Sequence, residues 1–98
     1  MKVPVVTSDD YILYFELYET YTFIHCDCFR WSKMVKKHLE KDLDLLASIH
    51  RKDIYAIHET NDKKHLKFIE MLKFVFVKDI ISFDNIERQL FVRKYHGN

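Results

Sequence analysis

The sequence is poor in the residues that interrupt regular structure. Its 98 residues include a single Gly, at position 97, and a single Pro, at position 4. This scarcity excludes a Gly- or Pro-rich linker, a low-complexity tract and a collagen-like repeat. It also disfavours a loop that wraps closely around a phosphate, because such an approach usually needs residues without a Cβ.

Neither charge of one sign nor apolar sequence is concentrated in long runs. The chain has 16 Lys and Arg against 15 Asp and Glu, a net charge of +1, which gives no overall attraction to nucleic acid. No apolar run approaches the roughly 20 residues that span a bilayer, and we see no signal peptide. We therefore expect neither nucleic acid nor a membrane as a partner, and a cytoplasmic location.

Cysteine is also scarce. Cys26 and Cys28 lie two positions apart on a predicted strand, so they point the same way, a poor arrangement for a disulfide. We interpret them as thiols in a reducing compartment. The cysteines and the six histidines include no pair at the spacing of a zinc site, so we expect no metal.

Apolar and aromatic residues, in contrast, are plentiful. They make up 48% and 15% of the chain, which is typical of one packed domain at this length. We place that domain at residues 11–95. Residues 1–10 are interpreted as an N-terminal arm, either poorly ordered or forming an edge segment, and residues 96–98 as a tail.

Hydrophobic periodicity divides the domain into strands and helices. Alternating or continuous apolar runs predict strands, and apolar residues at three- and four-residue steps predict helices. The predicted strands are 11–19, 21–28, 53–58, 74–81 and 88–95, and the predicted helices are 33–49 and 63–72. The order β-β-α-β-α-β-β predicts an α/β fold with helices packed on a mixed sheet. A right-handed crossover would make strands 21–28 and 53–58 parallel.

Two segments carry a family resemblance. Residues 61–76, Asn-Asp-Lys-Lys-His-Leu-Lys-Phe-Ile-Glu-Met-Leu-Lys-Phe-Val-Phe, resemble the Asn-led helix after the fifth strand of the GNAT superfamily of N-acetyltransferases. The strand, basic turn and helix of residues 21–49 then resemble its acetyl-CoA motif, with Arg30 at a Gln/Arg position. The element order of 11–95 is similar to the C-terminal half of that superfamily, and more narrowly to small GNAT-like proteins of tailed phages, including internal virion proteins.

The resemblance implies a minimal GNAT-like domain, a phage N-acetyltransferase that binds acetyl-CoA where strands 21–28 and 53–58 splay apart. It implies a location in the host-cell cytoplasm or in the virion. His25 or Glu59 would take the proton of the acceptor amine. The residues implied to hold the cofactor are Cys26, Asp27, Cys28, Phe29, Arg30, Trp31, Ser32, Lys33 and Asn61.

Several residues depart from the family pattern. Lys33 and Val35 occupy positions of small residues, Lys73 stands where the family has Gly, and Ile69 stands where it often has a Tyr that protonates the leaving thiolate. These departures give the alternative function: a catalytically inactive GNAT-like fold that serves as a virion component or as an interaction or inhibitor module for a host protein.

The candidate site residues also have structural interpretations. The basic turn is either a pyrophosphate site or an ordinary solvated face, and Trp31 could stack on adenine or anchor a partner. His25 and Asp27 could together form a general base, or both could have a purely structural role within their strand. If strand 11–19 is a sheet edge, it could bind a host or virion protein, or a second copy, giving a homodimer through the first hairpin.

Overall fold

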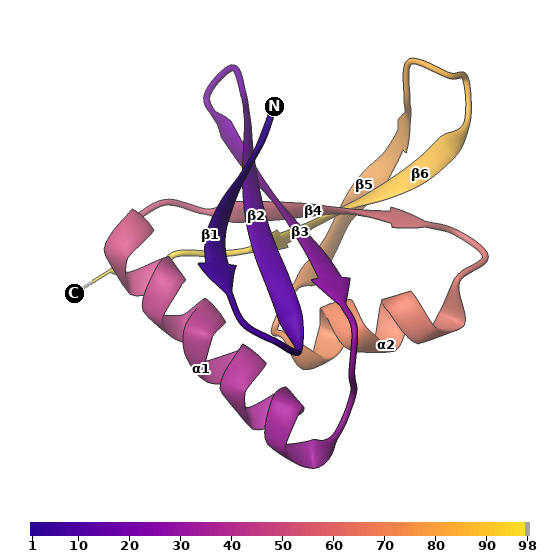
Figure 1. Ribbon diagram of the computed structural model, residues 1–98. Helices are drawn as coiled ribbons and strands as arrows, with labels where there is room; N and C mark the ends of the chain where they lie inside the picture. Colours follow the sequence, from indigo (N-terminus) through magenta and orange to yellow (C-terminus); the bar gives the residue numbers. More distant parts are fainter. Residues whose placement is uncertain (98) are drawn as a thin grey trace.

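The computed structural model describes residues 1–97, within which the chain forms six strands and two helices (Figure 1). Asn98, the last residue of the expected tail, lies outside the described residues. The fold is α/β with a mixed sheet, as predicted. Its strands are β1 (Lys2–Thr7), β2 (Tyr11–Tyr18), β3 (Tyr21–Cys28), β4 (Ile54–Glu59), β5 (Val75–Ile81) and β6 (Glu87–Arg93), and its helices are α1 (Lys33–His50) and α2 (Lys63–Met71).

The strands form a single sheet in the order β1-β2-β3-β4-β6-β5. The β3–β4 pair is parallel, as predicted from the crossover through α1, and the other neighbours are antiparallel. Beyond their single register pair, Phe23 with Tyr55, β3 and β4 diverge (Figure 1). Because α1 follows β3 and α2 follows β4, both helices begin beside this divergence.

The N-terminal segment corrects one prediction. Residues 2–7 form β1, which pairs with β2 on the side opposite β3. The prediction that strand 11–19 is a sheet edge is therefore wrong, and so is the premise for a homodimer through the first hairpin. Pro4 had suggested weak order, but an edge strand tolerates proline, and Val5 and Val6 pack against the core.

Both helices bury their apolar stripes against the same face of the sheet. Leu39 and Leu43 of α1 and Ile69 of α2 belong to one core cluster with Leu13 of β2 and Ile54 of β4. Each buried aliphatic side chain contributes about 1.5–3 kcal/mol to folding. In β4, only alternate residues are fully buried, although its first four residues are all apolar.

Helix α2 ends in a left-handed residue that is not glycine. Lys73 has φ 70°, its N–H donates to the Glu70 carbonyl at 3.0 Å, and the Phe74 N–H donates to the Ile69 carbonyl at 3.2 Å. This bond pattern is a Schellman motif, with buried Ile69 and Phe74 supplying its usual apolar contact. The position favours glycine, yet the sequence places a lysine there.

Candidate functional site

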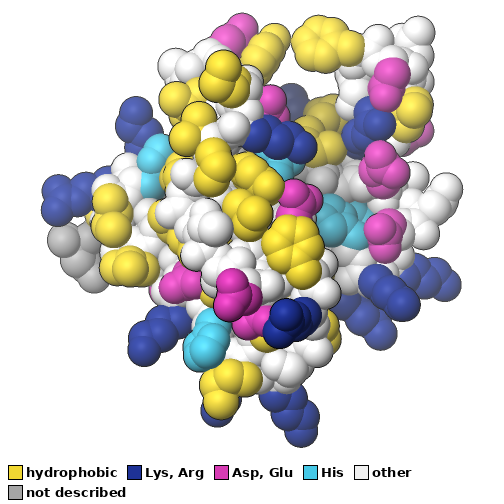
Figure 2. Space-filling model, viewed as in Figure 1, with side chains coloured by type: hydrophobic (Ala, Val, Ile, Leu, Met, Phe, Trp, Pro, Cys, Tyr) yellow, Lys and Arg dark blue, Asp and Glu magenta, His cyan; other side chains and the backbone are white. Residues whose placement is uncertain are grey.

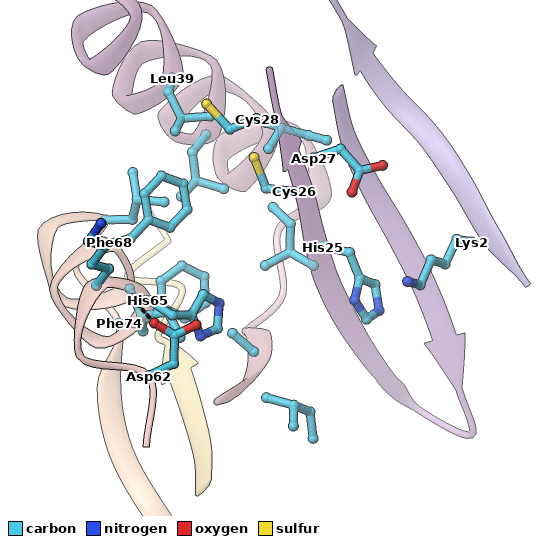
Figure 3. Close-up of a pocket in the computed structure, with 18 residues that line it drawn as sticks. Lys2, His25, Cys26, Asp27, Cys28, Leu39, Asp62, His65, Phe68 and Phe74 are labelled. Carbon is cyan, nitrogen blue, oxygen red and sulfur yellow. Dashed lines mark hydrogen bonds between the residues drawn. The ribbon is translucent and has the colours of Figure 1, made fainter. Parts of the chain in front are cut away.

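A cavity of about 500 Å³ lies where β3 and β4 diverge, with α2 forming one wall (Figure 3). Its lining is mostly apolar, and its inner end reaches the core residues Leu39 and Leu43. Polar side chains enter from β3 and from the start of α2. The lining includes Ile24, His25, Cys26, Asp27, Cys28, Ala56, Asp62, His65, Phe68 and Ile69.

The β3 wall contains four of the residues predicted to form the site, positions 25–28. Cys26 is directed toward the helices, and burial raises the pKa of its thiol to about 12, so the thiol stays neutral and is a poor nucleophile at pH 7. Cys28 is exposed and its thiol donates to the Arg30 carbonyl at 3.2 Å. Both cysteines are free.

His25 lies at the rim of the cavity, on the face of β3 opposite to Cys26 (Figure 3). It does pair with a carboxylate, but with Glu16 at 2.9 Å and not with Asp27, which accepts a hydrogen bond from the Tyr14 hydroxyl at 2.8 Å. The hydrogen bond from His25 lowers the pKa of Glu16. The hairpin register explains this pairing. Tyr14 lies opposite His25, so Glu16 is a diagonal cross-strand neighbour of His25, and such neighbours interact.

The turn between β3 and α1 uses its backbone donors internally. The N–H groups of Phe29 and Arg30 both donate to the Asp10 carbonyl, at 2.8 and 3.3 Å. Ser32 is the N-cap of α1, and its hydroxyl accepts the Val35 N–H at 3.1 Å. Two residues that the resemblance assigned to the cofactor, Phe29 and Arg30, therefore have their N–H groups already bonded within the chain.

The side chains of this turn remain accessible. Arg30 and Lys33 are exposed, and basic side chains gather over the starts of both helices (Figure 2). Trp31 is about half exposed and contacts Phe68 of α2 edge-on, with ring centroids 5.8 Å apart. Because Phe68 lines the cavity, Trp31 connects the turn to the α2 wall.

The structure does not bring Glu59 and Asn61 to the cavity. They lie beside a separate surface hollow, where the Glu59 carboxylate accepts a 3.4 Å bond from Arg88. The next residue, Asp62, lines the cavity instead. It is the N-cap of α2 and accepts the His65 N–H at 3.0 Å. The residue observed at the cavity, Asp62, is therefore the immediate neighbour of Asn61, the residue predicted there.

His65, which lines the cavity, is paired with the buried His58, a contact that sequence reasoning missed. His58, at 1% exposure, lies with its Nδ1 2.9 Å from Nδ1 of His65, and the two rings stack with centroids 5.1 Å apart. Burial first, and then the neighbouring His58, lower the pKa of His65. A signal existed, because Ile54, Ala56 and His58 alternate on the buried face of β4 and His65 falls in the first turn of α2.

Comparisons of the chain with protein-family models, with curated proteins and with solved structures found no match. Among residues 1–97, no helix has the length and apolar character needed to cross a membrane. The same residues include no group of three or more His, Cys, Asp or Glu side chains placed to hold a metal ion. The function of the cavity must therefore be inferred from its own geometry.

Proposed function

We propose that this chain is a GNAT-like domain that binds acetyl-CoA, with the pantetheine arm in the cavity between β3 and β4. The observation that carries the proposal is the divergence of two parallel strands after the Phe23–Tyr55 pair. This divergence leaves a cavity of about 500 Å³ between them. Facing strand edges offer N–H and C=O groups to an amide-bearing ligand, as in strand addition. The apolar lining fits the rest of such an arm.

The diphosphate of acetyl-CoA fits this chain less completely. The N–H groups of Phe29 and Arg30 are bonded to Asp10, so they are not donors to a ligand here. Two kinds of group remain. One is the exposed side chains of Arg30 and Lys33, and the other is the positive end of the α1 dipole. The N–H groups of Lys33 and Met34, in the first turn of α1, are available donors at that end. We assign the diphosphate to this helix start.

The end of α2 supports the resemblance independently. The GNAT pattern implies Gly at the place of Lys73, and the backbone there has the left-handed conformation that favours Gly. Phe74, which follows it as in the family pattern, is buried in the core. The chain thus retains the backbone conformation expected of the family although the side chain differs.

Bound acetyl-CoA would supply an acetyl group activated as a thioester, which an amine can attack directly. The chain's own contribution is a base at the cavity rim. Because Nε2 of His25 is bonded to Glu16 at 2.9 Å, its Nδ1 is the nitrogen left to accept the amine proton. The Glu16 carboxylate, by accepting the Nε2–H, holds the ring in that tautomer.

Isothermal titration calorimetry with acetyl-CoA tests the proposal. We expect saturable binding that weakens severalfold in Arg30→Ala and in Lys33→Ala, because each removes a positive charge beside the diphosphate. Lys41→Ala, an exposed charge farther along α1, is the matched control and should bind as the wild type does. An absence of binding at millimolar acetyl-CoA would refute the proposal, and unchanged affinity in both variants would refute the diphosphate assignment.

The second candidate function is an inactive GNAT-like fold that binds a host or virion protein. It is favoured by the Asp10 carbonyl, which occupies two N–H groups of the turn, and by exposed aromatic residues there, Phe29 at 60% and Trp31 at 53%. Aromatic residues of this kind are typical interface anchors. This candidate predicts no response to acetyl-CoA in the titration above.

A further inference from the structure

A basic hollow lies on the surface at the C-terminal end of α1. Its volume is about 500 Å³, and its lining comes from the last turn of α1, from the residue after the end of α2 and from the chain after β6, which runs past the end of α1 (Figure 1). The basic residues that line it are Arg51, Lys73, Arg93, Lys94 and His96. Within residues 1–97, no Asp or Glu belongs to this lining.

Two of these cations keep their charge unpaired. Arg93 and Lys94 each have a carboxylate partner, but Arg51 and Lys73 are exposed and form no ion pair with the residues that the structure describes. Each of the two follows the end of a helix, where a cation offsets the negative end of the helix dipole. That end amounts to about half a charge, so both side chains leave a net positive charge at the hollow.

A second hollow, of about 370 Å³, adjoins the first and contains tyrosine rings. Arg51 and Tyr95 line both hollows. Tyr21 and Tyr55 line the second, where their ring centroids are 5.2 Å apart and Tyr21 is 43% exposed. The N–H of Tyr95 donates to the Asp53 carboxylate at 2.8 Å, which fixes the chain after β6 beside the start of β4. Unpaired cations and accessible aromatic rings therefore lie side by side.

We propose that the two hollows bind single-stranded nucleic acid, with its phosphates beside Arg51 and Lys73 and its bases on the tyrosine rings. Cations that contact the backbone, together with aromatic rings on which bases stack, are the combination that binds single strands without sequence preference. A duplex keeps its bases stacked on one another, so it could not use the rings. Two adjoining hollows favour an extended strand over a single nucleotide.

The net charge of the chain, +1, does not indicate this surface. Its cations come from three separate stretches, at residues 51–52, 73 and 93–96, and only the fold brings them together. The proposal goes beyond the proposed function and does not depend on it. The diphosphate was assigned to the start of α1, and this 18-residue helix, about 27 Å long, separates that assignment from the basic hollow.

Fluorescence anisotropy with a labelled thymidine oligonucleotide of about 12 nucleotides, within the range of known site sizes, tests the cations. We expect saturable binding that weakens as salt is raised from about 50 to about 200 mM. Arg51→Gln/Lys73→Gln should weaken binding roughly tenfold and reduce the slope of log affinity against log salt by about 1.4, since each contact with a single strand contributes about 0.7. Lys37→Gln/Lys41→Gln, which removes two exposed charges elsewhere on α1, should bind within about twofold of the wild type.

Tyr95→Leu tests the aromatic contact separately from charge. It should weaken oligonucleotide binding by about fivefold or more while the salt slope stays unchanged, because base stacking contributes about 1–3 kcal/mol per base. Circular dichroism checks the fold of each variant. The proposal would be overturned by an absence of binding at about 50 mM salt, by equal weakening in the Lys37→Gln/Lys41→Gln control, or by competition from polyglutamate or thymidine monophosphate as strong as that from unlabelled oligonucleotide.

Calorimetry with acetyl-CoA separates this inference from the proposed function. Arg51→Gln/Lys73→Gln should bind acetyl-CoA as the wild type does. Equal losses of acetyl-CoA and oligonucleotide binding in this variant would show that the hollow holds the nucleotide part of CoA, and would overturn the proposal. Failure of the wild type to bind acetyl-CoA, with oligonucleotide binding intact, would refute the proposed function alone.

Discussion

Two connections of the same kind flank the cavity, and they differ in what their backbones and side chains do. The β3–α1 turn and the β4–α2 turn follow parallel strands, and each ends in a capping residue, Ser32 and Asp62. In the first, two backbone N–H groups are bonded to Asp10 and the basic side chains of Arg30 and Lys33 are exposed. In the second, the helix start places His65 in the cavity, against buried His58.

The difference shows that a strand-to-helix turn is not by itself an anion site. The dipole of α1 is present, but the N–H groups of Phe29 and Arg30, in the turn before the helix, are bonded to the Asp10 carbonyl. The β4–α2 connection, in which the resemblance singled out Glu59 and Asn61, leads instead to a helix start whose His65 is the more enclosed polar group.

Of the changes that test this difference, removal of the buried imidazole of His58 should have the largest effect on stability. His58→Ala leaves a cavity behind β4 and deprives His65 of its partner, so we expect a loss of about 3 kcal/mol in the free energy of unfolding. His38→Ala, on the exposed side of α1, should change it by less than about 0.5 kcal/mol. Urea denaturation measures both, and equal effects would contradict the enclosure of His58.

The two caps allow a direct comparison of the helix starts. Ser32→Ala and Asp62→Ala each remove a side-chain acceptor for a backbone N–H, and each should cost about 1 kcal/mol of stability. Only Asp62→Ala should also alter the cavity, because the Asp62 carboxylate raises the pKa of His65 and its loss should lower that pKa further. An NMR titration of His65 in both variants checks this, and an equal shift in Ser32→Ala would contradict it.

The ends of the two helices should respond to glycine. Lys73 follows α2 with φ 70° and Arg51 follows α1 with φ 59°. Glycine relieves the strain of the left-handed conformation but loses more entropy on folding. We expect Lys73→Gly and Arg51→Gly each to stabilise the fold by roughly 0.5 to 1 kcal/mol in thermal unfolding. Lys41→Gly, inside α1, should destabilise it by about 1 kcal/mol, and stabilisation there would show that the effect is not specific to these positions.

Mild acid should have the smallest effect, and it should involve both helices. Burial is the main cause that lowers the pKa of His65 and of His50 below their ordinary value of 6.5. As the pH falls, the unfolded chain binds protons at these residues before the folded chain does, so stability is full above about pH 7 and declines from pH 6.5 downward. His65→Gln and His50→Gln should each make the unfolding free energy less dependent on pH between 6.5 and 5, and an unchanged pH dependence in both variants would contradict this prediction.

The elements with clear periodicity were predictable from the sequence. The bounds of β3 and the start of α1 at Lys33 agree with the structure, because alternation changes to three- and four-residue steps at Ser32. Strand β1 was not firmly predicted, since Pro4 and the polar residues after it obscured a strand that is stabilised by pairing with β2.

In the candidate site, the sequence could predict neighbours within one strand but not contacts between different elements. Residues 25–28, which the resemblance assigned to the site, line the cavity together, because they follow one another on β3. The occupation of the Phe29 and Arg30 N–H groups depends on the Asp10 carbonyl, a backbone group whose position no side-chain pattern reveals. The His58–His65 contact spans seven positions and two elements, and the choice of Glu16 over Asp27 by His25 depends on hairpin register.

The most direct measurement of the central claim is an NMR titration of the backbone amides with acetyl-CoA. Binding in the cavity predicts saturable shifts in β3 from Ile24 to Cys28 and in α2 from His65 to Ile69, with amides of the β5–β6 hairpin unchanged. Saturable shifts confined to that hairpin, or none at millimolar acetyl-CoA, would contradict the account.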